Sequence, residues 1–352
     1  MKDKYKVVGI MSGTSLDGLD FVLVEFFKET KWYFKLISSS THPYPKKIYE
    51  KLKHSSSLHI DDIKILDQFY TIYLSKQISK FLKKNNEHEI DFISSHGHTV
   101  LHQPSSGVTY QIGNLPILAK LINKKVICDF RPKDVKMGGQ GAPLVPVGEI
   151  KLFHQSDTFI NLGGFANITL KNEKKTIAYD ICPANLILNS LANKLNKPYD
   201  KDGELASKGK LIPELERKLN KLNFFKLKPP KSLGIEWVKE NILPIFEIYQ
   251  KCSINDILYT YTIFIAKKIS YELSGRKEAL VTGGGAFNSF LIEQIKNRTS
   301  CLIRIPEKKV INFKEAIIFA FLGLLRDQNK VNCYSSVTGA KKNHSTGNIF
   351  LP

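Results

Sequence analysis

The 352-residue sequence contains no apolar stretch long enough to cross a membrane as a helix. Its opening segment, MKDKYKVVGIM, is too short and too soon interrupted for a signal peptide. The five cysteines are scattered and form no CxxC pair, which favours free thiols in a reducing compartment over a disulfide framework or a zinc site. These features predict a cytoplasmic protein with no membrane partner.

Arginine is scarce, although the formal net charge is +19. Only six of the 52 basic residues are arginine, and the lysines are spread over the whole length. Proteins that clamp phosphates or read bases favour arginine, because its guanidinium forms two parallel hydrogen bonds. The even lysine background is more typical of solvated faces, so we predict no nucleic-acid partner.

Two common nucleotide-binding motifs are missing as well. The absence of GxxxxGK[ST] excludes a P-loop NTPase, and no GxGxxG opens a helix after the first strand, which argues against an ordinary Rossmann dehydrogenase. The sequence instead has three Gly-rich turns, in the segments GIMSGTSLDGLD, INLGGFANIT and VTGGGAFNS. Such turns let backbone N–H groups approach a phosphate, although on the first segment alone an ordinary hairpin turn is equally compatible.

Strand-like and helix-like patterns alternate in both halves of the chain, which predicts an α/β fold. The length exceeds that of one compact domain, so two domains are expected. Gly13 and Gly163 lie 150 residues apart in similar strand–turn–strand settings, which suggests duplicated lobes that face each other across a cleft. The Gly- and Pro-rich segment 131–146 is a candidate domain junction or ligand loop.

Together with the three turns, further segments resemble the anhydro-N-acetylmuramic acid kinase family, in this order: SHGHT, YQIGN, GGQGAPLVP, YDICPANLILN, PPKSLGIEW and FKEAIIFAFLG. The resemblance runs from Gly9 nearly to the C-terminus. It implies two actin-like (ribonuclease H-like) lobes with an ATP cleft between them. The first lobe would comprise residues 1–140, joined by 325–352, and the second residues 141–324.

The resemblance also assigns roles to residues. The nucleotide would be held by a first phosphate loop, a second phosphate loop and a nucleoside loop: Gly13, Thr14, Ser15, Leu16, Asp17, Gly18, Leu19 and Asp20; Gly163 and Gly164; Gly283, Gly284, Gly285 and Asn288. Asp17 would lie near Mg²⁺, through waters that this ion retains. The sugar side would be lined by His96, Gly97, His98, Gln111, Asn114, Arg131, Asp134, Gln140, Gly141 and Ala142.

The implied reaction opens 1,6-anhydro-N-acetylmuramic acid with water and phosphorylates its 6-oxygen with ATP, as part of peptidoglycan recycling. Water is a weak nucleophile, so a general base is required. Asp180, which closes the strand-like TIAYD, is the candidate base, and a helix N-cap is its alternative role. Glu315 begins the helix-like FKEAIIFAFLG, where an acid usually serves the helix dipole, but the resemblance makes it a second active-site carboxylate.

Two segments depart from the family pattern. His98 replaces the amide of the usual SHGQT, and Ile181 and Cys182 stand in a loop that usually reads DTGPGN. Both departures bear on sugar and phosphate contacts, so a kinase for a different sugar remains an alternative.

Two further alternatives belong to other functional classes. His96 and His98 form an HxH pair typical of some metallohydrolases, but zinc needs more ligands in register, and His154 and His344 have no helpful spacing. An actin-like ATPase without a sugar pocket would keep the nucleotide loops, yet SHGHT and GGQGAPLVP speak against it. The family suggests a homodimer that acts on a small amino sugar.

Overall fold

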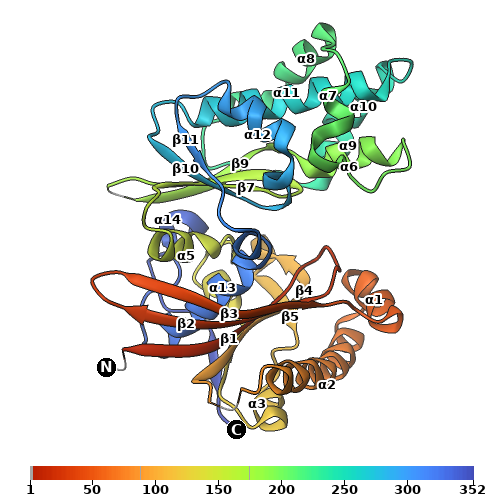
Figure 1. Cartoon of the computed structure of the whole chain (residues 1–352). Helices are drawn as coiled ribbons and strands as arrows, with labels where there is room; N and C mark the ends of the chain where they lie inside the picture. The colour runs from red at the N-terminus through yellow and green to blue at the C-terminus, as the bar shows by residue number, and fades with distance from the viewer. Residues whose placement is uncertain (1–2, 88, 174) are drawn as a thin grey trace. The chain divides into compact units, whose positions relative to one another are not determined.

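The computed structural model describes residues 3–87, 89–173 and 175–352. The chain divides into two compact units (Figure 1): unit 1 comprises Met1–His154 and Phe313–Pro352, and unit 2 comprises Gln155–Asn312. Within the described residues, no helix combines the length and the apolar character that crossing a bilayer requires.

The sheet of unit 1 has the strand order β12-β6-β4-β1-β2-β3, with β5 paired to β4. Neighbours β1, β2 and β3 are antiparallel, whereas β4 is parallel to both β1 and β6. The strands are β1 (Lys4–Ser12), β2 (Leu19–Lys28), β3 (Trp32–His42), β4 (Phe92–Gln103), β5 (Val108–Ile112), β6 (Val126–Cys128) and β12 (Asn348–Phe350).

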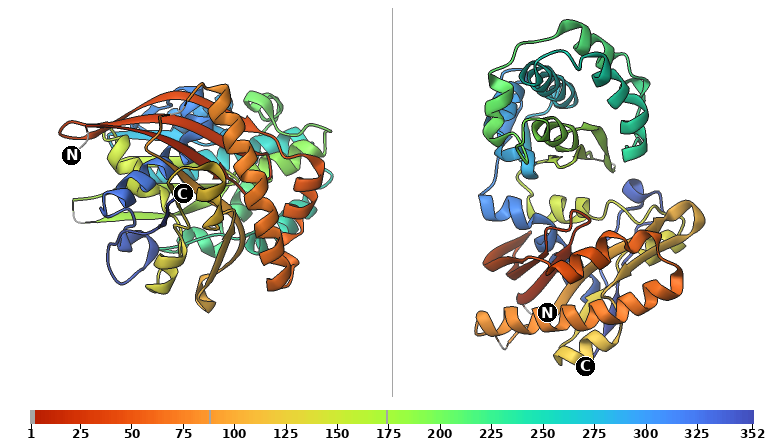
Figure 2. Two further views of the ribbon diagram at one scale, coloured as in Figure 1. Left: turned by 90° about the horizontal axis from the view of Figure 1, so that it is seen from below. Right: turned by 90° about the vertical axis from the view of Figure 1, so that its right-hand side faces the viewer.

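Helices cover both faces of this sheet, because successive residues of its buried strands point to opposite sides. Val8 of β1 packs in a core cluster with the long helix α2, whereas Val7 packs in another with α5 and α13. Figure 2 shows α2 as the long orange helix along the sheet. The helices are α1 (Lys46–Lys53), α2 (Ile60–Lys84), α3 (Ile117–Ile122), α4 (Pro132–Lys136), α5 (Val145–Leu152), α13 (Lys308–Asp327) and α14 (Ser335–Thr338).

Unit 2 repeats this arrangement in the order β11-β10-β7-β8-β9. Strands β7, β8 and β9 form an antiparallel meander, and β10 is parallel to both β7 and β11. The strands are β7 (Thr158–Leu162), β8 (Phe165–Lys171), β9 (Thr176–Pro183), β10 (Glu278–Thr282) and β11 (Leu302–Arg304). The order therefore matches β6-β4-β1-β2-β3 of unit 1, with the same strand directions, and the predicted α/β duplication of two ribonuclease H-like lobes is confirmed.

The core of unit 2 lies between its sheet and a group of helices centred on α11, which packs with β7, β9 and α12 through an unbroken apolar cluster. The helices are α6 (Asn185–Asn193), α7 (Glu204–Ser207), α8 (Pro213–Asn220), α9 (Ile235–Asn241), α10 (Leu243–Ile248), α11 (Ile254–Glu272) and α12 (Ser289–Lys296).

The boundaries of the units differ from those expected at 140/141 and 324/325. Val147 and Leu152 of α5 lie in the core of unit 1, as do the residues of α13 from Ala316 to Leu325. Close contact fixes α13 there: a side chain on Gly9 of β1 would collide with the backbone oxygen of Ala316. Burial of these two helices therefore extends unit 1 to His154 and starts its second segment at Phe313.

Candidate functional site

The first phosphate hairpin of unit 1 is the turn between β1 and β2. Leu16 N–H donates to Gly13 O at 3.3 Å, which closes the turn. Gly18 has φ +146°, and a Cβ there would lie 2.5 Å from His42 O, so only glycine fits. Thr14, Ser15 and Asp17 are exposed. The turn therefore presents two hydroxyl groups and a carboxylate to solvent.

Three carboxylates gather beside this hairpin. Burial raises the pKa of Asp20, although the hydrogen bond that Thr41 Oγ1 donates at 2.5 Å lowers it. The negative charges of Glu315 and Asp17 raise this pKa further. Mutual repulsion of this kind is relieved by a cation, and oxygen ligands are those that Mg²⁺ prefers. Glu315 is exposed and stands in the interior of α13, not in its first turn, because the helix begins at Lys308.

His98 lies directly behind the hairpin, in a buried hydrogen-bond network. Its Nδ1 is 2.9 Å from Ser12 Oγ, which is 2.6 Å from Tyr44 OH and also accepts from Tyr70 OH at 3.0 Å. Burial lowers the pKa of His98 to about 4, so the imidazole is neutral at physiological pH. The histidine that departs from the family pattern thus connects the phosphate hairpin to helix α2.

His96 has different partners, set by Arg131. Arg131 Nε donates to His96 Nε2 at 2.9 Å, and Arg131 Nη1 donates to Gly141 O at 2.6 Å. His96 Nδ1 then carries the proton and donates to Gly97 O at 2.8 Å. Burial and the Arg131 charge hold the pKa of His96 well below its usual value. Since both nitrogens are engaged beside a cation, this HxH pair does not fit a catalytic metal.

Gln111 and Asn114 bring two unpartnered acceptors to the same region. Gln111 Nε2 donates to Thr109 Oγ1 at 2.8 Å, and Asn114 Nδ2 donates to His96 O at 3.2 Å. Their side-chain oxygens are buried and have no hydrogen-bond partner within the described part of the chain. A buried acceptor without a donor costs free energy, so both oxygens are suited to receive donors from a ligand.

The remaining residues of the predicted sugar side form the turn after α4. Asp134 is fully buried, and its Oδ2 accepts from Gly141 N at 2.7 Å while Oδ1 accepts from Thr338 Oγ1 at 2.7 Å. Gln140 is exposed, and Ala142 is half-buried. The structure therefore gives Asp134, whose side chain has no solvent-exposed surface, a role in shaping this turn.

In unit 2, the second phosphate hairpin is the two-residue turn between β7 and β8. Gly163 O accepts from Asn185 N at 3.1 Å, and Gly164 O accepts from Ala184 N at 2.8 Å. These bonds hold the turn against the start of α6. Gly164 is exposed, so its backbone can approach a phosphate closely.

Asp180 lies inside β9 and not at its end, because the strand continues to Pro183. A β-bulge interrupts the β8–β9 register immediately after it, and bulges often re-aim side chains near functional sites. The N-cap of α6 is Ala184, so the alternative capping role is wrong.

The PPKSLGIEW segment, residues 229–237, orients Asp180. Asp180 N donates to Lys231 O at 3.1 Å, and Oδ2 accepts from Leu233 N at 2.8 Å. Among the described residues nothing hydrogen-bonds to Oδ1. Burial raises the pKa of Asp180, opposed by the Leu233 N–H. One oriented oxygen and one free oxygen suit a general base.

The nucleoside loop opens a cavity of about 580 Å³ in unit 2. Gly283 has φ +82°, and a Cβ there would lie 2.7 Å from Asn161 Oδ1, so glycine is required. Asn288 Oδ1 accepts from Leu291 N at 2.9 Å and caps α12. The cavity is lined by Asn185, Leu188, Asn189, Tyr199, Asp200, Lys201, Asp202, Gly284, Gly285, Phe287, Asn288 and Lys308.

Sequence reasoning found three of these lining residues and missed the segment Tyr199–Asp202. The sequence of this segment gave little indication of a binding role, because KDG at residues 201–203 indicates only a turn. Asp200 fixes this segment by accepting from Leu205 N and Ala206 N at 2.8 and 2.9 Å.

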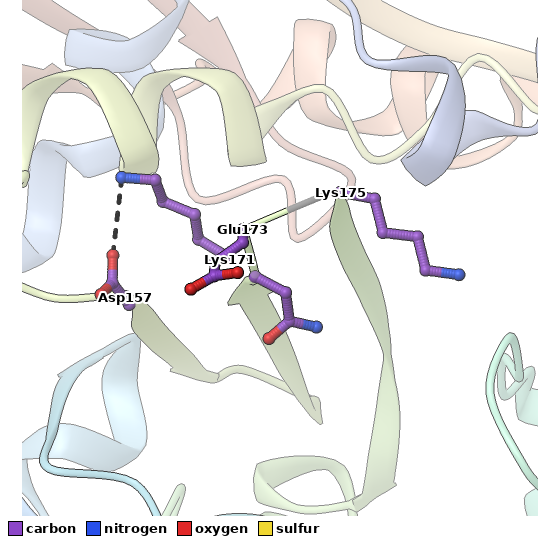
Figure 3. Close-up of a pocket in the computed structure, with 5 residues that line it drawn as sticks. Asp157, Lys171, Glu173 and Lys175 are labelled. Atoms are coloured by element: carbon purple, nitrogen blue, oxygen red, sulfur yellow. Dashed lines mark ion pairs between the residues drawn. The ribbon is translucent and has the colours of Figure 1, made fainter.

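A different pocket of unit 2 holds none of the predicted residues. Figure 3 shows it at the β8–β9 hairpin, with Lys171 Nζ 3.6 Å from Asp157 Oδ1. This hairpin stands at the opposite end of β8 from Gly164, and the side chains of Asp157, Lys171, Glu173 and Lys175 are exposed. We interpret it as a solvated turn.

Comparison with known proteins agrees with the resemblance. A sequence model described as anhydro-N-acetylmuramic acid kinase matches residues 5–352. Proteins of that name from Bacillus cereus (strain Q1) and Bacillus thuringiensis subsp. konkukian (strain 97-27) are each 32% identical to the chain, over 98% of it and 99% of their own length. Among solved structures, the chain is similar to component A of the (R)-2-hydroxyglutaryl-CoA dehydratase of Acidaminococcus fermentans, with 13% sequence identity and a TM-score of 0.47. The match covers 90% of this chain and 96% of that protein. A likeness this low supports no functional argument.

Proposed function

The chain belongs to the anhydro-N-acetylmuramic acid kinase family, and on that premise we propose that it converts 1,6-anhydro-N-acetylmuramic acid, water and ATP into N-acetylmuramic acid 6-phosphate and ADP. This reaction would serve peptidoglycan recycling. A water oxygen adds to the anomeric carbon and the bond from that carbon to the 6-oxygen breaks. The 6-oxygen then takes the γ-phosphoryl group.

Asp180 is the proposed base that takes the proton from water. The observation that carries this proposal is its half-buried carboxylate, with Oδ2 held by Leu233 N at 2.8 Å. Burial raises the carboxyl pKa toward the pH at which a general base is effective. The same fixed oxygen prevents rotation of the carboxylate, so the free oxygen keeps one direction.

The loops of unit 2 support ATP as the phosphoryl donor. A cavity of about 580 Å³ is within the range of nucleotide-sized ligands, and Gly284 and Gly285 on its wall let the backbone approach closely. Gly163 and Gly164 would contact phosphate through backbone N–H groups. In unit 1 the exposed hydroxyls of Thr14 and Ser15 would do the same.

The carboxylates of unit 1 support Mg²⁺ as the accompanying ion. Asp17, Asp20 and Glu315 would hold it through water. Burial raises the Asp20 pKa, and the negative charges of Glu315 and Asp17 raise it further, which supports a cation beside these groups. When bound, the ion would neutralise charge on the transferred phosphoryl group.

The unpartnered oxygens of Gln111 and Asn114 support an amino-sugar substrate, because hydroxyl and acetamido groups donate hydrogen bonds. Arg131 and His96 keep the adjoining turn in place. We further propose a homodimer in the cytoplasm. The five free cysteines support that location, and sedimentation without and with ATP would measure the oligomeric state.

The decisive experiment is a reaction in heavy-oxygen water with the anhydro-sugar and ATP. We expect label on the anomeric hydroxyl of early product and none in the phosphate ester. The open-ring sugar serves as the exchange control, because anomeric hydroxyls exchange slowly with solvent. Label that accumulates in inorganic phosphate would identify an actin-like ATPase instead, and turnover of other anhydro-sugars at a higher rate would identify a different substrate.

A further inference from the structure

The C-terminal segment brings a cysteine and a histidine to the buried side chain of Asp134. Cys333 and His344 face each other in an antiparallel bridge, with backbone N–O distances of 3.1 and 3.2 Å. Asp134 and Cys333 are 0% exposed and His344 is 6% exposed. This trio, which we call the C-terminal cluster, is not part of the proposed kinase chemistry.

The three side chains offer ligand atoms at distances that suit a small metal ion. Cys333 Sγ lies 3.0 Å and His344 Nε2 lies 3.5 Å from Asp134 Oδ1, and all three atoms lie within 4.8 Å of one another. Tetrahedral zinc holds sulfur at about 2.3 Å and nitrogen or oxygen at about 2.0–2.2 Å, which separates neighbouring ligand atoms by roughly 3.3–3.6 Å. Small side-chain movements would therefore bring these three atoms to three of the four ligand positions around a tetrahedral zinc ion.

The hydrogen bond made by His344 Nδ1 leaves the other ring nitrogen, Nε2, available to a metal ion. Its Nδ1 is 3.0 Å from Lys342 O, and since a carbonyl can only accept, Nδ1 carries the proton. Its Nε2 faces Asp134 Oδ1 at 3.5 Å, which is longer than an ordinary N–H···O hydrogen bond, and this buried nitrogen has no hydrogen-bond partner in the described chain. A metal-ligating histidine commonly donates its other N–H to a backbone carbonyl, which is the arrangement seen here.

Charge balance favours a divalent ion that binds sulfur. Asp134 and a Cys333 thiolate together supply two negative charges, so a divalent cation leaves the buried cluster neutral. Without metal, burial and the hydrogen bond to Asp134 raise the pKa of Cys333, so the thiol keeps its proton. Metal binding would displace that proton to solvent. Thiolate and imidazole ligands select zinc over magnesium.

We propose that Asp134, Cys333 and His344 form a structural zinc site. The Thr338 hydroxyl donates to the same Asp134 oxygen at 2.7 Å and would hold this carboxylate ligand in place. The site would tie the C-terminal segment to the turn after α4, because Asp134 Oδ2 also accepts from Gly141 N, and Gly141 O accepts from Arg131. Zinc would thus stabilise a turn in the predicted sugar side without contacting substrate.

The test uses full-length protein without a histidine tag, purified without chelators and analysed for metal by mass spectrometry. We expect about one zinc per chain, and less than a tenth of that in Cys333→Ser and in His344→Gln. Cys252→Ser and His59→Gln, which change more exposed residues outside the cluster, should retain zinc. Stoichiometric zinc in both cluster variants would overturn the proposal.

A second measurement needs no variant and so does not depend on their folding. Cobalt added to the metal-free wild type should give sulfur-to-cobalt charge-transfer absorption, which carboxylates such as Asp17 cannot produce. Zinc should protect Cys333 from alkylation, as mapped on peptides, and should raise the melting temperature. A wild type that shows no such absorption, protection or thermal shift refutes the site, whatever its kinase activity.

Discussion

Units 1 and 2 build the same order of five strands, yet they place different chemistry on it. The β1–β2 turn spans residues 13–18 and carries hydroxyls and an acid, whereas the β7–β8 turn is only Gly163 and Gly164. A long turn can present side chains to a cation, but a two-glycine turn can offer only backbone N–H groups. One hairpin of the duplication therefore suits the metal, and the other suits the phosphate alone.

Buried titratable groups differ between the units as well. Residues 155–312, which make up unit 2, contain none of the nine histidines of the sequence, whereas unit 1 contains the buried His96 and His98. Unit 2 instead carries Asp180, whose pKa is raised by burial without the neighbouring carboxylates that repel Asp20 in unit 1, and whose Oδ2 is oriented by Leu233 N–H. The comparison predicts that water activation depends on unit 2, whereas sensitivity to mildly acidic pH arises in unit 1.

The largest expected effect tests the role of unit 2 in water activation. Asp180→Asn keeps the shape and can still accept from Leu233 N–H, but it cannot take a proton. We expect turnover to fall by roughly 10²–10⁴ with an unchanged melting temperature. Asp157→Asn, an exposed aspartate of the same unit, is the matched control. Near-normal turnover in Asp180→Asn would assign the base elsewhere, with Glu315 the next candidate.

The second prediction tests the difference between the two hairpins. Asp17→Asn removes an exposed carboxylate that would hold Mg²⁺ through water, so the KM for magnesium-ATP should rise roughly 10–100-fold. Sugar affinity, measured by calorimetry without nucleotide, should not change. Asp61→Asn on α2 is the control for the loss of one surface charge. Unchanged magnesium-ATP kinetics in Asp17→Asn would show that the first hairpin does not hold the metal.

A third, smaller effect concerns pH. The pKa of His98 falls from 6.5 to about 4 in the folded protein, so the unfolded chain binds the proton more readily. The contribution of His98 to the free energy of unfolding is therefore fully present above about pH 6.5 and is lost as the pH falls toward 4. Between pH 7.5 and 5 this histidine should lower the free energy of unfolding by about 2 kcal/mol.

Denaturant titrations at both pH values measure this loss, and His98→Gln should reduce it by about 2 kcal/mol. The exposed His59→Gln should leave it unchanged. Hydrogen exchange should locate the acid-sensitive amides in unit 1. An equal loss in His98→Gln would mean that the Ser12 network does not control this titration.

How far the sequence predicts the molecule depends on how local each feature is. Glycine turns between apolar strands are encoded within a dozen residues, so all three loops and the duplication were predictable. The helix α13 begins with KKVIN, which holds two lysines, an asparagine and only two apolar residues, and this mixed start concealed that Glu315 lies inside the helix. The cavity wall at Tyr199 depends on chain packing, and Asp134 meets Cys333 across 199 residues. No local pattern records either contact.

The smallest effect tests whether the unpartnered acceptors of unit 1 serve a ligand. Gln111→Met keeps the side-chain length and removes Oε1, along with the bond to Thr109. If a sugar donor binds this oxygen, the KM for the anhydro-sugar should rise roughly 5–10-fold, the equivalent of one neutral hydrogen bond.

The melting temperature should hold or rise slightly, because the substitution also removes a buried acceptor that has no donor in the described free protein. Gln68→Met, at an exposed position of α2 in the same unit, controls for the added methionine. A fall in melting temperature with an unchanged KM would show that Gln111 supports only the β4–β5 hairpin, and the sugar would then have to bind through other residues of unit 1.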